Sequence, residues 1–217
     1  MVVRTVRKPE ESAKNPRGCP ARPIAESYRD KDQSCGLNCF HHHRDQWGAR
    51  GQTAIDRLQS LVETSARRLL IAQQVALAKW DSGAAVEDVS REAQVIMGAV
   101  KDGQSRGLDP ISVSNFFKAQ IEANKIVQYS LLADWHRSGK VPAHAPVKLV
   151  ATIRPKLDQV QATLIAELAD TAAIRASATC SADVTKAVGK YVVAHKHDVG
   201  PLQVIALDRA LAAACTL

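Results

Sequence analysis

Apolar residues recur at three- and four-residue spacing along the chain after Thr53, which is the pattern of helices that pack by one face. Nowhere do apolar and polar residues alternate for long enough to predict a strand. The six predicted helices run from Thr53 to about Trp80, from Glu87 or Asp88 to about Ser105, from Pro110 to about Arg137, from about Leu149 through Leu168, from Ser181 to Val193 and from Pro201 to about Ala214. The pattern therefore predicts an all-α fold without a sheet, with three long helices followed by C-terminal helices.

Capping residues and helix breakers support these boundaries. Thr53 and Ser181 are residue types that accept hydrogen bonds from the first free N–H groups of a helix. Asp109 followed by Pro110 is typical of a helix start, because proline suits the first helical position. Gly83 follows the first predicted helix, where a glycine commonly ends one.

The first fifty residues have a different composition from the rest. They hold one Ile, one Leu, ten basic and six acidic residues, so that four of the chain's seven net positive charges lie there. A segment so poor in aliphatic residues cannot offset the entropy that it would lose on ordering. We therefore predict a disordered segment over residues 1–52 and a folded domain over residues 53–217.

Charged residues lie where apolar helix faces would otherwise continue. Arg68 and Lys79 are eleven positions apart, about three helical turns, so they share a face with Ala72 and Val75 between them. Two long cations on a dry stripe indicate an anion site; the alternative is that both side chains extend to solvent. Polar residues also interrupt the later helices: Asp88, Arg91 and Glu92 in the second, Asn124 and Gln128 in the third, and Arg154 in the fourth.

Each of these later groups has an ordinary structural interpretation as well. The charges of the second helix are spaced like a surface ion-pair cluster, which contributes little to stability. The two amides of the third helix would need hydrogen-bond partners if they are buried. Taken together, however, four helices contribute several donors and few acceptors, which is what a small polyanion requires.

At these residues the sequence resembles the all-helical chorismate mutases, over about residues 53–217 and with compatible spacings. The likeness rests on the runs Arg68 to Trp80, Val86 to Ala93, Gly107 to Pro110, Phe116 to Gln128 and Ile153 to Asp158. The last three runs are similar to the exported, or gamma, subclass in particular. The resemblance implies a six-helix chorismate mutase type II fold, in which residues 53–139 form the main pocket and residues 146–217 complete it.

The resemblance also implies an isomerase that converts chorismate to prephenate, on the route to phenylalanine and tyrosine. This Claisen rearrangement occurs within one molecule and needs no nucleophile, so we expect no cofactor. The enzyme must hold the substrate in its reactive conformation and stabilise the negative charge that develops on the ether oxygen.

The family's functional positions match residues of this sequence. Arg68, Arg91 and Arg154 would hold the substrate, mostly through its two carboxylates, because guanidinium groups bind carboxylates with two parallel hydrogen bonds. Lys79 and Gln128 match the pair that contacts the ether oxygen, with Lys79 also near a carboxylate.

Three further positions match less directly. Glu92 by its side chain, and Asp88 mainly by its backbone, correspond to the positions at the substrate hydroxyl. Asn124 stands where the family usually has Ser or Thr, so its role differs from the pattern. The residues that we expect to act in catalysis are Arg68, Lys79, Arg91, Glu92 and Gln128.

The cysteines bear on the compartment. In the exported subclass a disulfide joins the C-terminal helices, and Cys180 and Cys215 match that pair; two buried free thiols are the alternative. A disulfide implies an oxidising compartment, so we expect a periplasmic or secreted protein. Exported members begin with a cleavable signal, whereas no apolar run follows the basic start here. Either the protein stays in the cytoplasm or its natural precursor begins differently.

Cys35, Cys39 and the histidines at 41–43 suggest zinc, but Cys-x3-Cys followed by three histidines is not an established zinc spacing, and we expect no metal.

Two other functions stay open: a related chorismate or isochorismate pyruvate lyase, and a non-enzymatic basic helical module. Against the module, no helix-turn-helix signature is present and aromatic residues are not interleaved with basic ones. We expect chorismate as substrate, no nucleic acid or membrane partner, and a monomer or homodimer with a complete pocket in each chain.

Overall fold

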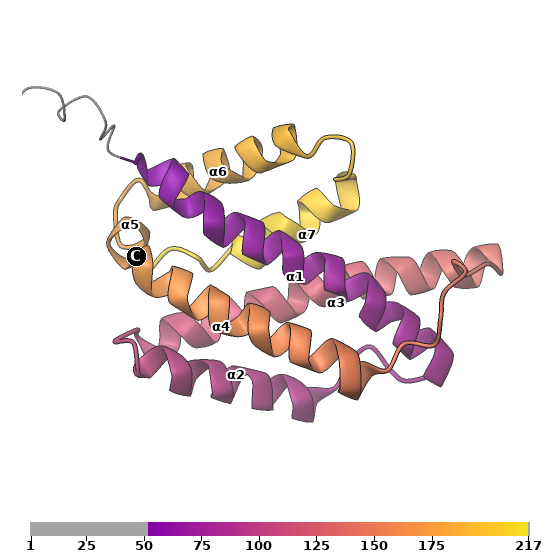
Figure 1. Ribbon diagram of the computed structural model, residues 1–217. Coiled ribbons are helices and arrows are strands. Elements are labelled where there is room, and N and C mark those ends of the chain that lie inside the picture. Colours follow the sequence, from indigo (N-terminus) through magenta and orange to yellow (C-terminus); the bar gives the residue numbers. More distant parts are fainter. Residues whose placement is uncertain (1–51, 217) are drawn as a thin grey trace, which may run out of the picture. The chain divides into compact units, whose positions relative to one another are not determined.

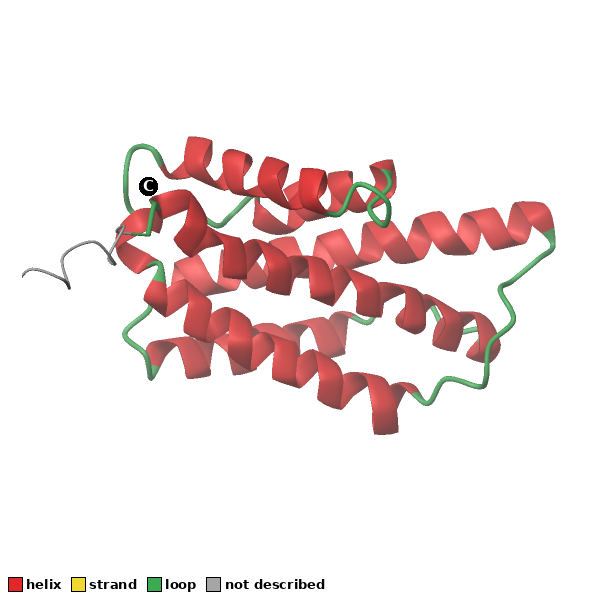
Figure 2. Cartoon of the chain, turned by 45° about the horizontal axis from the view of Figure 1, so that its top comes forward, coloured by secondary structure: helices red, strands yellow, loops and turns green. Residues whose placement is uncertain are grey.

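The computed structural model describes residues 52–216, which form seven α-helices and one π-helix (Figures 1 and 2). In chain order these are α1 (Ala54–Ser82), α2 (Val89–Gln104), α3 (Pro110–Ser138), η1 (Leu149–Ile153), α4 (Arg154–Asp170), α5 (Ala172–Arg175), α6 (Cys180–Ala194) and α7 (Pro201–Leu211). These residues contain no strand, so the predicted all-α class is confirmed. The predicted disordered segment lies, apart from Gln52, outside the described residues. None of the described helices combines the length and apolar character needed to cross a membrane.

The three long helices begin and end where the capping residues predicted. Thr53 Oγ1 accepts a hydrogen bond from the N–H of Asp56 at 3.2 Å, and Asp109 Oδ2 accepts one from the N–H of Ser112 at 2.7 Å. Gly83 follows α1 with a φ of 65°, in the left-handed region that favours glycine. Local hydrogen bonding thus sets the lengths of the helices that carry most of the pocket.

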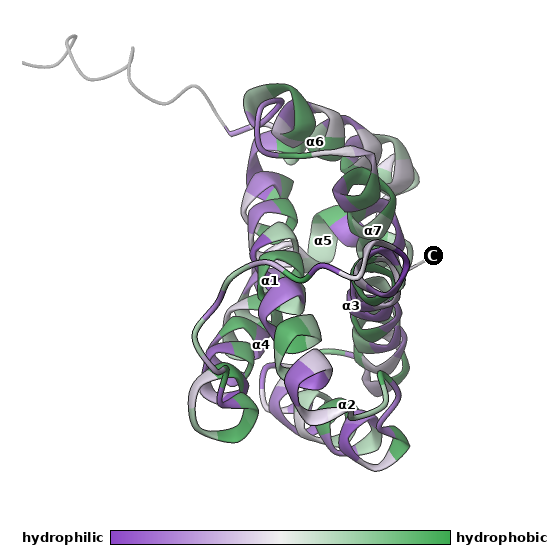
Figure 3. Cartoon of the chain, turned by 90° about the vertical axis from the view of Figure 1, so that its right-hand side faces the viewer, coloured by the Kyte–Doolittle hydropathy of each residue, from purple (hydrophilic) through white to green (hydrophobic). Residues whose placement is uncertain are grey.

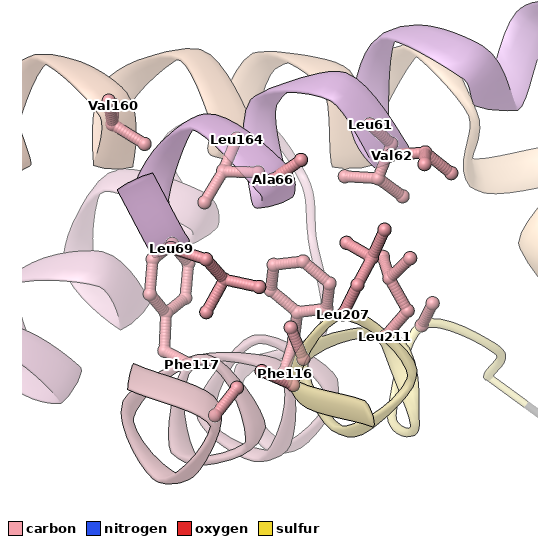
Figure 4. Close-up of a cluster of buried hydrophobic side chains, with 14 of the residues drawn as sticks. Leu61, Val62, Ala66, Leu69, Phe116, Phe117, Val160, Leu164, Leu207 and Leu211 are labelled. Carbon is pink, nitrogen blue, oxygen red and sulfur yellow. The ribbon is translucent and has the colours of Figure 1, made fainter. Parts of the chain in front are cut away.

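Helices α1 and α3 lie against each other at the centre of the described domain. Helices α2 and α4 pack beside them on one side, and α6 and α7 pack on the other, as the view along the helices in Figure 3 shows. Between them lies the larger of two apolar clusters (Figure 4), which includes Leu61, Val62, Leu69, Phe116, Phe117, Val160, Leu164, Leu207 and Leu211. This core keeps α1 and α3 side by side and so positions the polar residues farther along both helices.

The predicted fourth helix is not α-helical at its start. Residues Leu149–Ile153 form a π-helix turn, in which the N–H of Arg154 donates to the carbonyl of Leu149, five residues earlier. Pro155 explains the difference, because it lacks an N–H and its ring crowds the carbonyl four residues before it. The wider turn leads directly into α4, which therefore begins at Arg154.

Two predicted boundaries of the C-terminal helices are wrong. Ser181 lies inside α6 and Thr179 occupies the N-cap position, because the carbonyl of Thr179 already accepts the first helical hydrogen bond, from the N–H of Asp183 at 3.0 Å. Helix α7 ends at Leu211 instead of Ala214.

The chain after α7 is not helical, because a disulfide and hydrogen bonds hold it against α5 and α6. The predicted disulfide between Cys180 and Cys215 is confirmed, with a Cα–Cα distance of 5.9 Å. The N–H of Thr216 donates to the carbonyl of Arg175 at 3.0 Å. The Arg175 side chain is 2% exposed, and its guanidinium donates to the carbonyl of Ala214 at 2.6 Å. These contacts hold the chain after α7 against α5 and the start of α6.

Candidate functional site

A single pocket between α1, α2, α3 and the start of α4 brings together all eight residues predicted from the sequence. They are Arg68, Lys79, Asp88, Arg91, Glu92, Asn124, Gln128 and Arg154. The remaining lining residues are Lys125 and the apolar side chains of Val75, Val86, Val95, Ile121, Leu149 and Leu157. The polar groups therefore meet within largely apolar walls.

Helix α1 contributes the two most deeply buried cations. Arg68 is 5% exposed and Lys79 is 9% exposed, with Val75 between them on the same face, as their helical spacing predicts. Arg67, the neighbouring arginine, is exposed and does not line this pocket. Neither cation extends to solvent, so the alternative interpretation of this stripe does not apply.

Arg68 carries a charge that the protein does not neutralise by direct contact. No salt bridge joins it to another of the described residues, and its buried Nε has no hydrogen-bond partner. Burial lowers the pKa of Arg68 to about 10, and the negative charge of Asp158 partly offsets this effect. At neutral pH the guanidinium is therefore protonated, and its Nε–H donor has no partner among the described residues.

Lys79 is held by the loop that connects α1 to α2. Its ammonium donates to the carbonyl of Ala85 at 2.8 Å and to the carbonyl of Val86. Burial lowers the pKa of Lys79, while the carboxylates of Asp88 and Glu92 act in the opposite direction. Two carbonyl acceptors thus keep the ammonium at a defined place beside the pocket.

The start of α2 is organised by reciprocal hydrogen bonds. Asp88 Oδ1 accepts from the N–H of Arg91 at 3.0 Å, and the N–H of Asp88 donates to Glu92 Oε1 at 3.3 Å. Arg91 Nη2 lies 3.4 Å from Asp158 Oδ1 on α4, and both side chains of this pair are partly exposed. The cap thereby places a carboxylate and a guanidinium at the pocket edge.

The amides of α3 form a relay toward α1. Gln128 Nε2 donates to Asn124 Oδ1 at 2.7 Å, and Asn124 Nδ2 donates to the backbone carbonyl of Arg68 at 3.3 Å. Gln128 Oε1 is buried and has no partner among the described residues. The relay fixes the Gln128 amide, which uses only one of its two N–H bonds in these contacts.

Arg154 lines the pocket from the start of α4. It is the first residue of α4 and is half-buried, next to Leu149 of the π-turn, which also lines the pocket. Its position follows from the turn that Pro155 imposes, a feature that helical periodicity did not predict.

Lys125 is the charged lining residue that was not predicted as part of the site. Its ammonium lies 2.9 Å from Glu122 Oε1, 3.3 Å from Glu92 Oε2 and 3.8 Å from Glu87 Oε1. A sequence signal existed, because Lys125 follows Asn124 directly and stands three residues after Glu122 on a helix.

This arrangement can bind a small molecule that carries two negative groups. Buried cations interact strongly with an anion because the apolar walls lower the local dielectric. The lining residues include no Ser, Cys or His, so nothing in the pocket resembles a nucleophile with its base. Over residues 52–216 no three acidic, His or Cys side chains converge as metal ligands, while Cys35, Cys39 and the histidines at 41–43 lie outside the described residues.

The chain is similar to known proteins over its folded part. The family model described as "Chorismate mutase type II" matches residues 53–129. The secreted chorismate mutase of Mycolicibacterium smegmatis is 32% identical over 143 residues, which is 65% of this chain and 77% of that protein. The solved chorismate mutase of Burkholderia phymatum is 43% identical, with a TM-score of 0.71 over 76% of this chain and 99% of that one. The chorismate mutase of Burkholderia thailandensis is 31% identical, with a TM-score of 0.69 over 73% of this chain and 99% of that one.

Proposed function

The chain belongs to the chorismate mutase type II family, isomerases that convert chorismate to prephenate, and we propose that the pocket between α1, α2, α3 and α4 is its active site. This membership favours the mutase over the two alternatives that the sequence left open, a pyruvate lyase and a non-enzymatic helical module. The pocket supports the proposal because it offers buried cations and amides to a substrate that is a dianion.

The arginines hold the substrate through its carboxylates. Arg68 is the inner anchor, because its guanidinium is buried, protonated and without a carboxylate in contact. Arg91 and Arg154 approach from α2 and α4, so that cations from three helices surround one molecule. Such fixation selects the conformer in which the enolpyruvyl group lies over the ring, which removes part of the entropic barrier.

Lys79 and Gln128 stabilise the breaking C–O bond. The ether oxygen gains negative charge in the transition state, and a donor held in place beforehand stabilises that charge without reorganising. The Lys79 ammonium is anchored by the carbonyls of Ala85 and Val86, and Gln128 is oriented by Asn124. Asn124 therefore acts in our proposal by aiming the Gln128 amide.

The ring hydroxyl of chorismate is recognised at the start of α2. The carboxylate of Glu92 accepts the hydroxyl hydrogen, and the Asp88 N–H lies beside it, where it donates to Glu92 Oε1. This contact involves no atom whose bonds change, so it contributes to binding more than to the chemical step.

The observation that carries this assignment is a pair of unpartnered polar atoms on residues that line the pocket. Arg68 Nε and Gln128 Oε1 are both buried without a partner among the described residues, and Lys79 lines the same pocket. Buried polar groups are almost always paired, so unpaired groups that line a pocket favour a bound ligand.

Replacing Lys79 tests the site. Lys79→Ala should lower kcat by about 100- to 1,000-fold, because a donor to the charged ether oxygen is lost, while the helical CD signal is retained. The assay follows the loss of chorismate absorbance and the acid conversion of prephenate to phenylpyruvate. Lys118→Ala, at an exposed position of α3, is the matched control. Near wild-type turnover of the Lys79 variant would overturn the site, and release of pyruvate would indicate a lyase instead.

Replacing Gln128 tests the ether contact separately. Gln128→Glu preserves the shape, but a carboxyl group donates to the ether oxygen only when it is protonated. The activity of this variant should therefore rise toward low pH, whereas that of the wild type should not follow the same profile. Equal pH–rate profiles for the two proteins would count against the contact.

We also propose that one chain holds a complete pocket, because all eight predicted residues come from the same chain. Turnover per chain should then be the same at protein concentrations where light scattering shows monomers and at concentrations where it shows dimers.

The relative from Mycolicibacterium smegmatis is named as secreted and the present chain has a disulfide, so we propose export to an oxidising compartment. Cell fractionation of the producing organism tests this directly.

A further inference from the structure

Lys125 lines the proposed site, and its ammonium is paired with carboxylates of the protein. It projects from α3 into the pocket lining, one residue after Asn124 and three before Gln128. Its side chain is 14% exposed, which is low for a lysine, and the three nearest acids are more exposed than it is. A half-buried lysine with several acidic neighbours has a defined position.

The contact with Glu92 crosses between two helices. Lys125 Nζ donates to Glu92 Oε2 at 3.3 Å, and the Asp88 N–H donates to Glu92 Oε1 at 3.3 Å. Both carboxylate oxygens are therefore held, one by each donor, and the plane of the carboxylate is set. Glu122, one turn earlier on α3, holds the same ammonium at 2.9 Å and fixes the other end of the contact.

Glu92 interacts electrostatically with a second cation, Lys79, as well as with Lys125. The charge of Glu92 acts on Lys79, and the charge of Lys125 acts on Lys79 in the opposite sense. The Lys125 ammonium therefore holds the Glu92 carboxylate toward α3.

We propose that Lys125 is a positioning residue that holds the Glu92 carboxylate where it accepts the ring hydroxyl of chorismate. The inference rests on the proposed function, since Glu92 must contact the hydroxyl for its position to matter. The hydroxyl takes no part in the bonds that break and form, so loss of a well-placed acceptor weakens the ground state and the transition state alike. The effect of losing Lys125 falls on KM.

Steady-state kinetics of Lys125→Met test this assignment. We expect a KM for chorismate about tenfold higher and a kcat within about threefold of the wild type, as is typical of losing one charge-assisted hydrogen bond that binds both states equally. Lys125→Arg, which keeps a cation in reach of Glu92, should restore most of the loss. Lys118→Met is the matched control on the same helix and should behave as the wild type.

A double-mutant cycle shows whether Lys125 acts through Glu92. Glu92→Gln should raise KM by a similar factor, and adding Lys125→Met to it should cause little further loss. Where the Met variant loses its helical CD signal, Lys125→Gln, which removes only the charge, replaces it in the cycle. An unchanged KM in Lys125→Met, no rescue by arginine, or multiplying effects in the double variant would each overturn the proposal.

The same assay separates this inference from the proposed function. If Lys79→Ala retains wild-type turnover, the site itself is wrong and the result for Lys125 has no bearing on chorismate binding. If Lys79→Ala is inactive and Lys125→Met is unaffected, the site stands and only the positioning role is lost.

Discussion

Opening the disulfide between Cys180 and Cys215 should destabilise the domain without changing the active site. The bond joins the start of α6 to the residues after α7, and 35 positions separate the two cysteines. The pocket is lined by residues of the earlier helices and of the start of α4, so none of its side chains belongs to α6 or α7.

The magnitude follows from the length of the closed loop. A crosslink reduces the entropy of the unfolded chain, and for a separation of 35 residues the chain-entropy relation gives about 4 kcal/mol of stabilisation. The folded state should change little on reduction, because Arg175 still binds the carbonyl of Ala214 and the N–H of Thr216. The expected effect therefore acts mainly on the unfolded state.

Urea denaturation followed by CD measures this effect. With a dependence on urea of about 2 kcal/mol per M, the reduced protein should unfold at a midpoint about 2 M lower than the oxidised protein. Cys180→Ala/Cys215→Ala should resemble the reduced form, with a further loss because Cys180 is completely buried. Activity at low urea should be the same in all three.

Reductant also acts on the other cysteines, so the comparison needs a background in which Cys19, Cys35 and Cys39 are serine. In that background only the Cys180–Cys215 bond responds to reductant. Equal midpoints for the oxidised and reduced proteins would refute the loop-closure argument, and a loss of activity on reduction would show that α6 and α7 do support the pocket.

Three further predictions concern packing and charge. Gly103→Ala should lower the free energy of unfolding by about 1–2 kcal/mol, because the new Cβ would lie 2.9 Å from Val113 Cγ2. Gly98→Ala on the same helix, with no atom nearer than 3.7 Å, should instead raise it by up to about 1 kcal/mol. Urea titrations of both variants measure the two changes. Burial raises the pKa of the half-buried Glu167 carboxyl to about 7, so the contribution of this group to the free energy of unfolding falls as pH rises from about 4.5 to about 7. Glu167→Gln should therefore be more stable than the wild type by about 1–2 kcal/mol above pH 7 and equally stable at low pH. Arg175→Ala should cost about 3–5 kcal/mol in the same titration, because it opens a cavity and leaves buried acceptors unpaired.

The extent of the long helices was predictable because local interactions decide it. Thr53 and Asp109 cap α1 and α3 by bonding to N–H groups three residues ahead, and Gly83 ends α1 in a conformation that glycine readily adopts. The π-turn and the early end of α7 were not predictable from periodicity. The first arises where Pro155 crowds a preceding carbonyl, and the second where the chain bonds to Cys180, which is distant in sequence.

Local spacing likewise predicted only part of the candidate site. Helical spacing places Arg68 and Lys79 on one face, and the resemblance to a family supplied roles for the other polar residues.

The sequence by itself determined which residues form helices and which of them share a face, because both depend on neighbours within a few positions. Only the tertiary structure decided what each face meets. Lys125 reaches Glu92 across 33 positions because α2 packs beside α3, and Arg68 keeps a free donor because no acidic side chain of the surrounding described helices comes within contact distance. Contacts of this kind depend on how helices pack against one another, and the period of a helix carries no information about its partner.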